Sequence, residues 1–500
     1  MKKAILSVIC LMTAVAGLSA QTVTDEASYQ LNKARDLWYN SANAAGVAKG
    51  DMAPWRNLSA GYNLGKGDFT DSWNAKSQTG YGASGDMLTN LGGFKLLADA
   101  TFSRDELEQC MYNTSMYDVR WDMPFYVAMN TRERFPMHRM RAAASLSAVS
   151  PLMLNDRFSI ALSGSFDYSK AWRLGSVTSD YAAPGFEVSP SVIVVIDDNN
   201  TLGIAARYTK ETGTNVVSTG DGTSIEVVFL QGLGYYMPRW AGGNLGMAPI
   251  LYSTDSKGAS IQYNHKADAK EWLAEVSLDT GSTQVAESDG GRAKGAVNRY
   301  VTKADIQGIF GENRSRKLDL NVTYNLFYQL NGASGTAQGQ GSLIDGGLKY
   351  TAYTGTGAGN CFNFMMGAGI DISSMDLSRV TNTSFKALSL LPYAFVGKNF
   401  RFAEAHSLLA TLNAGYNFAM NTKYTPPASL AAGDVIANFM YDDEADYLHA
   451  YYARITAEVT YTFRIGDVLS LYARPRGGYI KPMNADGARA MCDFALGVIF

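Results

Sequence analysis

Histidines and nucleophile motifs are the first features to consider for chemistry, and this 500-residue chain has few of them. The four histidines, His138, His265, His406 and His449, are scattered and form no His-Glu-x-x-His metal motif. Neither a Gly-x-Ser-x-Gly nucleophile motif nor a glycine-rich phosphate loop followed by Lys-Ser/Thr occurs. The sequence therefore predicts a protein that is not an enzyme, with no cofactor and no metal site.

A short acidic run is the best candidate for cation binding. Asp442, Asp443, Glu444 and Asp446 offer carboxylate oxygens, which divalent cations prefer. The run lacks the spaced ligands and the turn glycine of a calcium loop. We therefore interpret it as a solvated loop.

A larger set of charged side chains recurs at alternate positions and falls on one face of the segments that carry it. In residues 451–464, Arg454, Glu458 and Arg464 share their face with threonines, and apolar side chains occupy the other face. Such two-residue spacing places side chains on one side of a β-strand. The charged residues predicted on this polar face are Lys95, Asp99, Asp319, Lys349, Asp371, Arg454, Glu458, Arg464, Arg474, Arg476 and Asp493.

The alternating runs that carry these charges are unusually long. From Leu408 to Met420 the even positions are apolar, and the odd positions include Thr411, Asn413 and Asn417. Strands of soluble proteins typically have ~5 to 6 residues, whereas a tilted strand needs ~9 to 11 residues to cross a membrane. Composition alone leaves a soluble β-sandwich or propeller open, but strand length favours a membrane barrel.

The overall composition agrees with strands and excludes spanning helices. Hydrophobic residues make up 46% of the chain, yet the mean hydropathy is only −0.11. Beyond the N-terminus no run approaches the ~20 apolar residues of a membrane helix. The formal charge of −3, without a basic stripe, argues against a nucleic-acid partner.

The C-terminal run 490–500 is itself an alternating strand that ends on an aromatic residue. Cys492, Phe494, Leu496 and the terminal Phe500 lie on its apolar face. Here the chain resembles the bacterial outer-membrane β-barrel superfamily, whose last strand alternates in this way and ends in Phe. The resemblance implies an all-β fold, a transmembrane antiparallel β-barrel in the outer membrane of a Gram-negative cell. It also implies contact with membrane lipid and makes Phe500 a signal to the outer-membrane insertion machinery.

The N-terminus has the pattern of an export signal. Residues 1–20 combine basic Lys2 and Lys3, an apolar run and small residues before Gln21, as in a cleaved signal peptide. We expect export through the inner membrane. The remaining cysteines, 110, 361 and 492, are scattered, so no disulfide framework is predicted, although one bridge is compatible with the periplasm.

The alternating runs predict about 16 to 20 strands, with 18 as the best value, in residues 56–500. The register is ambiguous at residues 57–87 and 235–258. We expect short turns at the periplasmic end, where the C-terminus lies, and long loops outside. The predicted turns are Asn155–Asp156, Asp197–Asn200, Lys266–Lys270, Gly311–Ser315, Thr354–Asn360 and Ile465–Asp467, and the predicted loops are Ser103–His138, Ala171–Gly185, Gly281–Asn298, Asn331–Gly341, Ser373–Ser384 and Asn421–Leu448.

Residues 21–55 precede the barrel and have a different character. Asp25 to Trp38 carries helix formers and an acidic first turn, which predicts a short helix. The following Asn43-Ala44-Ala45-Gly46 is similar to the Asn-Pro-Ala region of FadL-like fatty-acid channels, with Ala44 in place of proline. In that family the N-terminal segment plugs the lumen. The segment therefore forms either a small hatch inside the barrel or a periplasmic helix on its rim.

The polar inner face gives the functional expectation, a porin-like channel or transporter for a small solute or a hydrophobic ligand. Arg454, Arg464, Arg474 and Arg476 would form a basic wall for anions, but Glu458 and Asp493 on neighbouring strands favour neutralisation. The alternative is a non-conducting structural or assembly barrel that scaffolds envelope protein partners through long loops. An integral-membrane hydrolase is a third, weaker candidate. The apolar loop 121–126 either folds into the lumen, packs on the rim or meets a partner.

Overall fold

A computed structural model gives the structure of most of the chain. It describes residues 25–50, 52–114, 116–128, 135–175, 177–219, 225–230, 236–241, 248–288, 293–332, 334–355, 361–380, 382–426, 436–466 and 469–500. The expected signal peptide, residues 1–20, lies outside the described residues.

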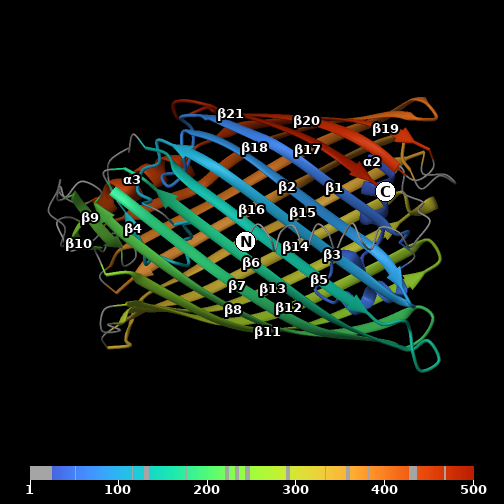
Figure 1. The fold of residues 1–500 in the computed structure, drawn as a ribbon, viewed down its shortest axis with the longest axis horizontal. Helices are drawn as coiled ribbons and strands as arrows, with labels where there is room; N and C mark the ends of the chain where they lie inside the picture. Colours follow the sequence, from blue (N-terminus) through green and yellow to red (C-terminus); the bar gives the residue numbers. More distant parts are fainter. Residues whose placement is uncertain are drawn as a thin grey trace.

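The chain forms a closed antiparallel barrel of 18 strands, which confirms the predicted fold class and the best value of the strand number. Each strand pairs with the next one in the sheet, and β1 pairs with β21 to close the ring (Figure 1). The barrel strands are β1 Trp55–Gly67, β2 Ser77–Leu91, β3 Phe94–Glu108, β5 Met137–Val149, β6 Phe158–Arg173, β7 Val177–Val195, β8 Asn200–Thr219, β11 Ile250–Ala267, β12 Lys270–Glu287, β13 Ala293–Phe310, β14 Arg316–Asn331, β15 Ala337–Thr354, β16 Phe364–Arg379, β17 Ser384–Ala403, β18 His406–Thr425, β19 Tyr452–Ile465, β20 Leu469–Pro482 and β21 Arg489–Ile499.

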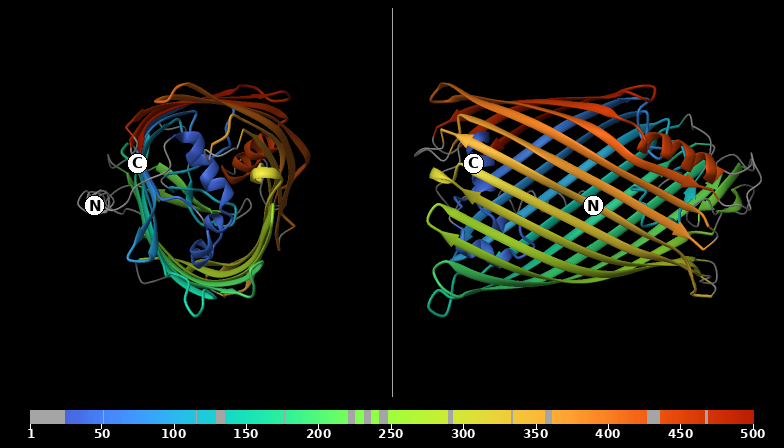
Figure 2. Two further views of the ribbon diagram at one scale, coloured as in Figure 1. Left: turned by 90° about the vertical axis from the view of Figure 1, so that its right-hand side faces the viewer. Right: turned by 180° about the vertical axis from the view of Figure 1, so that it is seen from behind.

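The remaining elements are short and lie at the two ends of the barrel. A small sheet of β4, β9 and β10 and helix α3 lie at one end, and the N-terminal helices lie at the end that holds the C-terminus (Figures 1 and 2). No helix among the described residues is long and apolar enough to cross a membrane. These elements are α2 Glu26–Arg35, η2 Trp38–Asn40, η3 Ala44–Lys49, β4 Val127–Ala128, β9 Ile225–Leu230, β10 Tyr236–Ala241, η4 Glu312–Arg314 and α3 Ile436–Leu448.

Alternation gives the wall two different faces. On β19, Ile455, Tyr461 and Phe463 are exposed on the outside, whereas Thr460 and Thr462 between them are buried inside the barrel. Large apolar side chains are exposed in the same way on other strands, such as Leu496 on β21. A barrel that turns its apolar side chains outward matches a lipid environment. The fold is that of a transmembrane β-barrel.

The C-terminal residue takes part in closing the barrel. The Phe500 carbonyl accepts a hydrogen bond from Arg56 N at 2.8 Å, and Phe500 N donates to the Arg56 carbonyl at 2.9 Å. The Arg56 guanidinium also lies over the Phe500 ring, 5.8 Å from its centroid. The last residue is therefore paired with the first strand. The role of Phe500 as an insertion signal stays a prediction.

The strands run further than the sequence indicated at the end away from the C-terminus. Residues 171–185, expected as a loop, belong mostly to β6 and β7, and residues 281–298 belong mostly to β12 and β13. Apolar–polar alternation is weak there because the inner face is also apolar. Tyr181, for example, faces inward and is buried against segments that fill the lumen. Residues 421–448, also expected as a loop, include helix α3.

Candidate functional site

The described part of the N-terminal segment, residues 25–50, lies inside the barrel at the end that holds the C-terminus (Figure 2). Helix α2 begins there because Asp25 caps it, accepting a hydrogen bond from Ser28 N at 2.7 Å. Asn43 caps η3 in the same way, accepting from Ala45 N at 3.1 Å. Two capped short helices thus give the segment a defined shape within the lumen.

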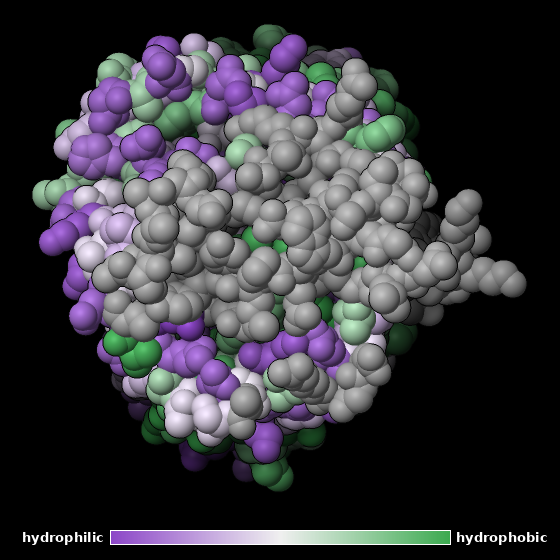
Figure 3. Space-filling view, turned by 90° about the vertical axis from the view of Figure 1, so that its left-hand side faces the viewer, coloured by the Kyte–Doolittle hydropathy of each residue, from purple (hydrophilic) through white to green (hydrophobic). Residues whose placement is uncertain are grey.

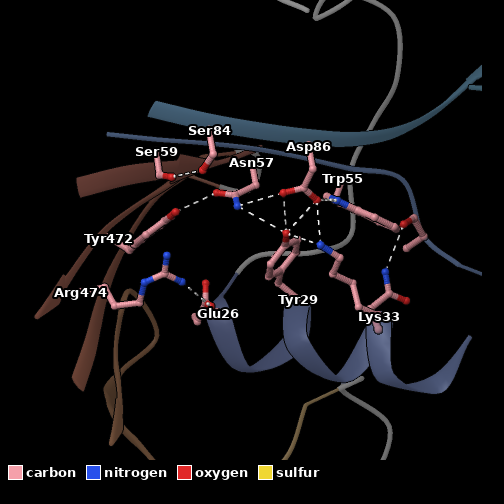
Figure 4. Close-up of polar contacts among 12 residues, drawn as sticks. Glu26, Tyr29, Lys33, Trp55, Asn57, Ser59, Ser84, Asp86, Tyr472 and Arg474 are labelled. Carbon is pink, nitrogen blue, oxygen red and sulfur yellow. Dashed lines mark hydrogen bonds and ion pairs between the residues drawn. The ribbon is translucent and has the colours of Figure 1, made fainter. Parts of the chain in front are cut away.

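Asp86 on β2 is the main polar anchor of helix α2 (Figure 4). Its carboxylate accepts from Tyr29 Oη at 2.7 and 2.8 Å and from Lys33 Nζ at 3.0 Å. Two barrel side chains complete the set, because Trp55 Nε1 donates at 2.8 Å and Asn57 Nδ2 at 3.3 Å. Hydrogen bonds to a charged group are stronger than neutral ones. One carboxylate of the wall therefore joins two side chains of the helix to two of β1.

The Lys33 ammonium also donates to Tyr29 Oη at 2.8 Å and lies close to three aromatic rings. Lys33 Nζ lies 4.6 Å from the ring centroid of Tyr29, 5.2 Å from Tyr39 and 5.8 Å from Trp55. Burial opposes the charge, but Asp86 and Tyr39 outweigh it and raise the pKa of Lys33 above its ordinary value. Lys33 is therefore a bound ammonium ion in a site built from three rings and one carboxylate, which we call the ammonium cage.

The Asn-Ala-Ala-Gly stretch is fixed against a different part of the wall. Asn43 is completely buried, and its Nδ2 donates to the Val192 carbonyl and to Gln262 Oε1, both at 2.9 Å. Gly46 lies directly beneath the Trp38 ring, and a side chain at this position would overlap that ring. These residues hold η2 and η3 against β7 and β11.

Further polar contacts join the segment to the wall around the barrel. Glu26 is buried beside Arg474, with Oε1 3.6 Å from Nη1, and its burial raises the pKa of Glu26. Asp25 Oδ2 lies 3.0 Å from Arg401 Nη2. Additional contacts of the same kind are Ser41 Oγ to Glu275 Oε2 at 2.7 Å, Arg35 Nη2 to the Asn313 carbonyl at 2.7 Å, Lys49 Nζ to Thr201 Oγ1 at 2.9 Å and Lys95 Nζ to the Val47 carbonyl at 2.8 Å.

A chamber of about 630 Å³ lies in the lumen next to helix α2. Arg474, which contacts Glu26 of the helix, is part of its lining, and so is Ser103 on β3. Gly61 and Gly82 leave room there because they carry no side chain. The polar side chains that line the chamber are Ser59, Asn63, Gln78, Ser84, Thr101, Ser103, Asp105, Glu458, Arg474, Arg476 and Asp493.

The chamber brings together four of the eleven charged residues predicted on the inner face, Glu458, Arg474, Arg476 and Asp493. Glu458, Arg476 and Asp493 face one another in register across β19, β20 and β21. They make none of the ion pairs found in the described part of the chain, and Arg476 is exposed to the lumen. Arg454 and Arg464 are on β19 outside the chamber, and Arg464 Nε donates to the Gly466 carbonyl at 2.9 Å.

The end away from the C-terminus is filled by apolar packing. The loop 121–126 folds into the lumen, and its Phe125 is buried in one cluster with inward-facing Val297 and Phe327. Asp122 on this loop pairs with Arg299 at 2.8 Å, and Arg299, helped by Arg120, holds the pKa of Asp122 below its usual range against the effect of burial. Figure 3 looks onto this end, where many hydrophilic side chains lie on the rim.

Among the described residues, the acidic run and the histidines do not gather into a metal site. Glu444 of α3 is buried and accepts from Ser72 N at 2.9 Å, and burial raises its pKa to about 8. Within the described ranges no group of three or more His, Cys, Asp or Glu side chains could hold a metal ion. His406 contacts Tyr461 and His138 stacks on Trp172, far apart on the wall. Cys110, Cys361 and Cys492 form no disulfide with one another.

Sequence reasoning missed the ammonium cage and its anchor. Asp86 and Lys33 are separated by 53 positions, and Trp55 is the first residue of β1. Alternation could have placed Asp86 on the inner face beside Asn57. Nothing in the sequence indicated which of the inward carboxylates would meet the helix.

A family model matches residues 45–500, which include the whole barrel and all of η3 except Ala44. The chain belongs to a family of unknown function, DUF6850. None of the curated proteins compared with the sequence matches it.

Solved outer-membrane barrels are similar to the chain over most of its length at low identity. The ferric-catecholate import receptor Fiu from Escherichia coli K12 has 10% identity and a TM-score of 0.44, covering 89% of this chain and 81% of the receptor. The FrpB iron transporter from Neisseria meningitidis has 11% identity and a TM-score of 0.41, covering 92% and 83%. A deletion mutant of the monoaromatic hydrocarbon channel TodX has 9% identity and a TM-score of 0.33, covering 92% and 94%.

Proposed function

We propose that this protein is an outer-membrane channel for small polar solutes, closed at its periplasmic end by residues 25–50. The observation that carries the proposal is the polar chamber, which lies inside the barrel between the N-terminal segment and the apolar closure at the other end. Its serine, asparagine and charged lining suits a hydrated solute better than a hydrophobic ligand. The C-terminus marks the periplasmic end in this orientation.

The two closures of the lumen differ in how they are held. The far closure buries a large apolar cluster around Phe125 and Phe229, and moving it would expose that surface to water. The N-terminal segment also packs apolar side chains such as Leu31 and Trp38 against the wall, but it adds hydrogen bonds and ion pairs to barrel side chains, such as those of Asp86 and Glu275. Water can replace such bonds at little net cost. We therefore propose that the N-terminal segment is the gate that moves more readily, and passage through the whole barrel also requires a path past the cluster around Phe125.

Solute uptake by proteoliposomes tests the proposed function. Liposomes with the purified full chain should swell in small neutral and charged polar solutes, and swelling should fall with solute size. Liposomes with heat-denatured protein serve as the control for leakage. If the folded protein gives no uptake of any solute and never conducts in planar bilayers, the channel proposal fails.

A structural barrel is the second candidate, and the filling of both ends of the lumen favours it. Such a protein would scaffold envelope partners through the rim, where hydrophilic side chains are plentiful (Figure 3). Reproducible co-purification of one envelope protein, together with absent uptake, would select this candidate over the channel.

A further inference from the structure

The charge of the chamber favours cations. Three carboxylates line it, Glu458, Asp493 and Asp105, against the guanidinium groups of Arg474 and Arg476. Arg474 is already paired with Glu26 of the helix. Asp105 accepts hydrogen bonds from neutral amides, since Asn63 and Gln78 donate to it at 3.3 and 3.2 Å. An excess of carboxylates on a low-dielectric wall raises the local concentration of cations.

The ammonium cage lies next to this chamber on the same strands. Ser59 and Ser84 line the chamber and hydrogen-bond each other at 2.8 Å. Asn57 and Asp86, which face each other in register, are the next inward positions on β1 and β2, about 7 Å further along each strand. Figure 4 shows the two serines beside Asn57 and the cage. A solute in the chamber is therefore one layer of side chains from Asp86.

The chemistry of the cage suits an organic ammonium group. Aromatic faces attract a cation through their quadrupoles, and a carboxylate supplies the opposite charge. A guanidinium group is larger and planar, and a small metal ion holds its water too strongly to exchange it for rings. The side chain of Lys33 is 27% exposed and that of Asp86 19%, so the site is partly open to water.

We propose that protonated organic amines are the solutes of this channel and that they open it by displacing the Lys33 ammonium from the cage of Tyr29, Tyr39, Trp55 and Asp86. This inference rests on the proposed channel function and adds its substrate class and its gate. Lys33 acts as a tethered ligand that keeps α2 docked until an amine replaces it. In amines with a second positive charge, that charge can also pair with the chamber carboxylates Glu458 and Asp493.

Competition with a tethered ligand sets the concentration range. A short tether gives Lys33 an effective concentration in the millimolar range, so a simple amine should act at roughly millimolar levels. Removing the tethered ammonium should leave the cage open to the free amine. Lys33→Met keeps the length and the apolar stem of the side chain and removes its charge.

Binding of n-butylammonium, a mimic of the lysine side chain, to the full chain in detergent tests the inference. Lys33→Met should bind it roughly tenfold more tightly than the wild type, as the loss of a competing interaction of about 1.4 kcal/mol predicts. Lys33→Met/Asp86→Asn should lose this binding. The inference would be overturned if Lys33→Met bound butanol as tightly as butylammonium. It would also be overturned if Lys33→Met and the wild type bound butylammonium with equal affinity.

The Lys33→Met substitution could itself undock the helix and destroy the cage. Amide hydrogen exchange in the wild type therefore gives a second test that does not depend on this variant. Millimolar butylammonium should speed exchange in residues 26–35, whereas butyrate and sodium chloride at the same ionic strength should not. If butylammonium left the exchange of residues 26–35 unchanged, the proposal would be wrong. Both measurements are made in detergent and do not depend on conduction. A protein that binds amines but never conducts would refute only the channel function. A protein that conducts but does not bind amines would refute only this inference.

Discussion

Replacing Asp86 by asparagine should raise the open probability of the channel about 30-fold, because it loosens the anchor of helix α2 by about 2 kcal/mol. The asparagine would keep one acceptor oxygen, but its NH₂ group would face donors from Lys33, Tyr29 and Trp55. The other contacts of the segment would remain, including those of Asn43. Single-channel recording in planar bilayers measures the change.

Asp345→Asn is the matched control for this experiment. Asp345 is also a carboxylate on the inner face, but it accepts from Ser373 on the neighbouring strand and lies outside the contacts of the N-terminal segment. Its substitution should leave the open probability within about twofold of the wild type, because the free energy of docking the N-terminal segment should change by less than about 0.5 kcal/mol. Equal effects of Asp86→Asn and Asp345→Asn would show that Asp86 does not hold the gate.

Val459→Arg should destabilise the folded barrel by about 2 to 4 kcal/mol, the cost of a basic side chain near the centre of the bilayer. Val459 lies near the middle of β19, between the exposed Ala457 and Tyr461 of the outer face. Its register partner is Ala410, whose small side chain gives an arginine no charged partner. Urea titration of the protein folded in phospholipid vesicles gives the free energy.

Thr456→Arg is the control for lipid exposure, since Thr456 is on the inner face of the same strand, opposite Asn413 and Gly478. Its side chain can reach water in the lumen, so the cost should be below about 1 kcal/mol. If both arginine variants were equally stable, the outer face of β19 would not meet lipid, and the assignment of the two faces would be wrong.

The barrel could be predicted from sequence because its pattern is local. Each strand alternates along its own length, as in Leu408–Met420, and turn residues such as Gly311 mark the ends, so the strand number follows from counting. The strand prediction was wrong where this alternation disappears. Around Tyr181 both faces of the strand meet protein or apolar surroundings, and the strand was expected to be a loop.

The site could be predicted only in part. Alternation placed Glu458, Arg476 and Asp493 on one face, and the register of the barrel then brings them together. It could not pair Arg474 with Glu26, because these residues come from opposite ends of the chain and meet only after the N-terminal segment has docked. The cage around Lys33 likewise forms only after the N-terminal segment has docked against β1 and β2. Such contacts depend on tertiary packing, for which a single sequence carries no local signal.

A reversible lock on the N-terminal segment tests the central claim most directly. The Ser191 hydroxyl of β7 lies 3.3 Å from the Ala45 amide of η3, so Ala45→Cys/Ser191→Cys can place two thiols in contact. The pair is introduced together with Asp86→Asn, after alanine has replaced cysteines 110, 361 and 492. Each single cysteine variant serves as a control for oxidation alone.

Current through one bilayer is then recorded before and after reduction. If the N-terminal segment is the gate, the oxidised double-cysteine protein should carry less than about one-tenth of the current of the reduced protein, since a disulfide removes the undocked state. The single-cysteine controls should not respond to reduction. The same current in the oxidised and reduced states would contradict the account, because solutes would then pass while the segment stays fixed in the lumen.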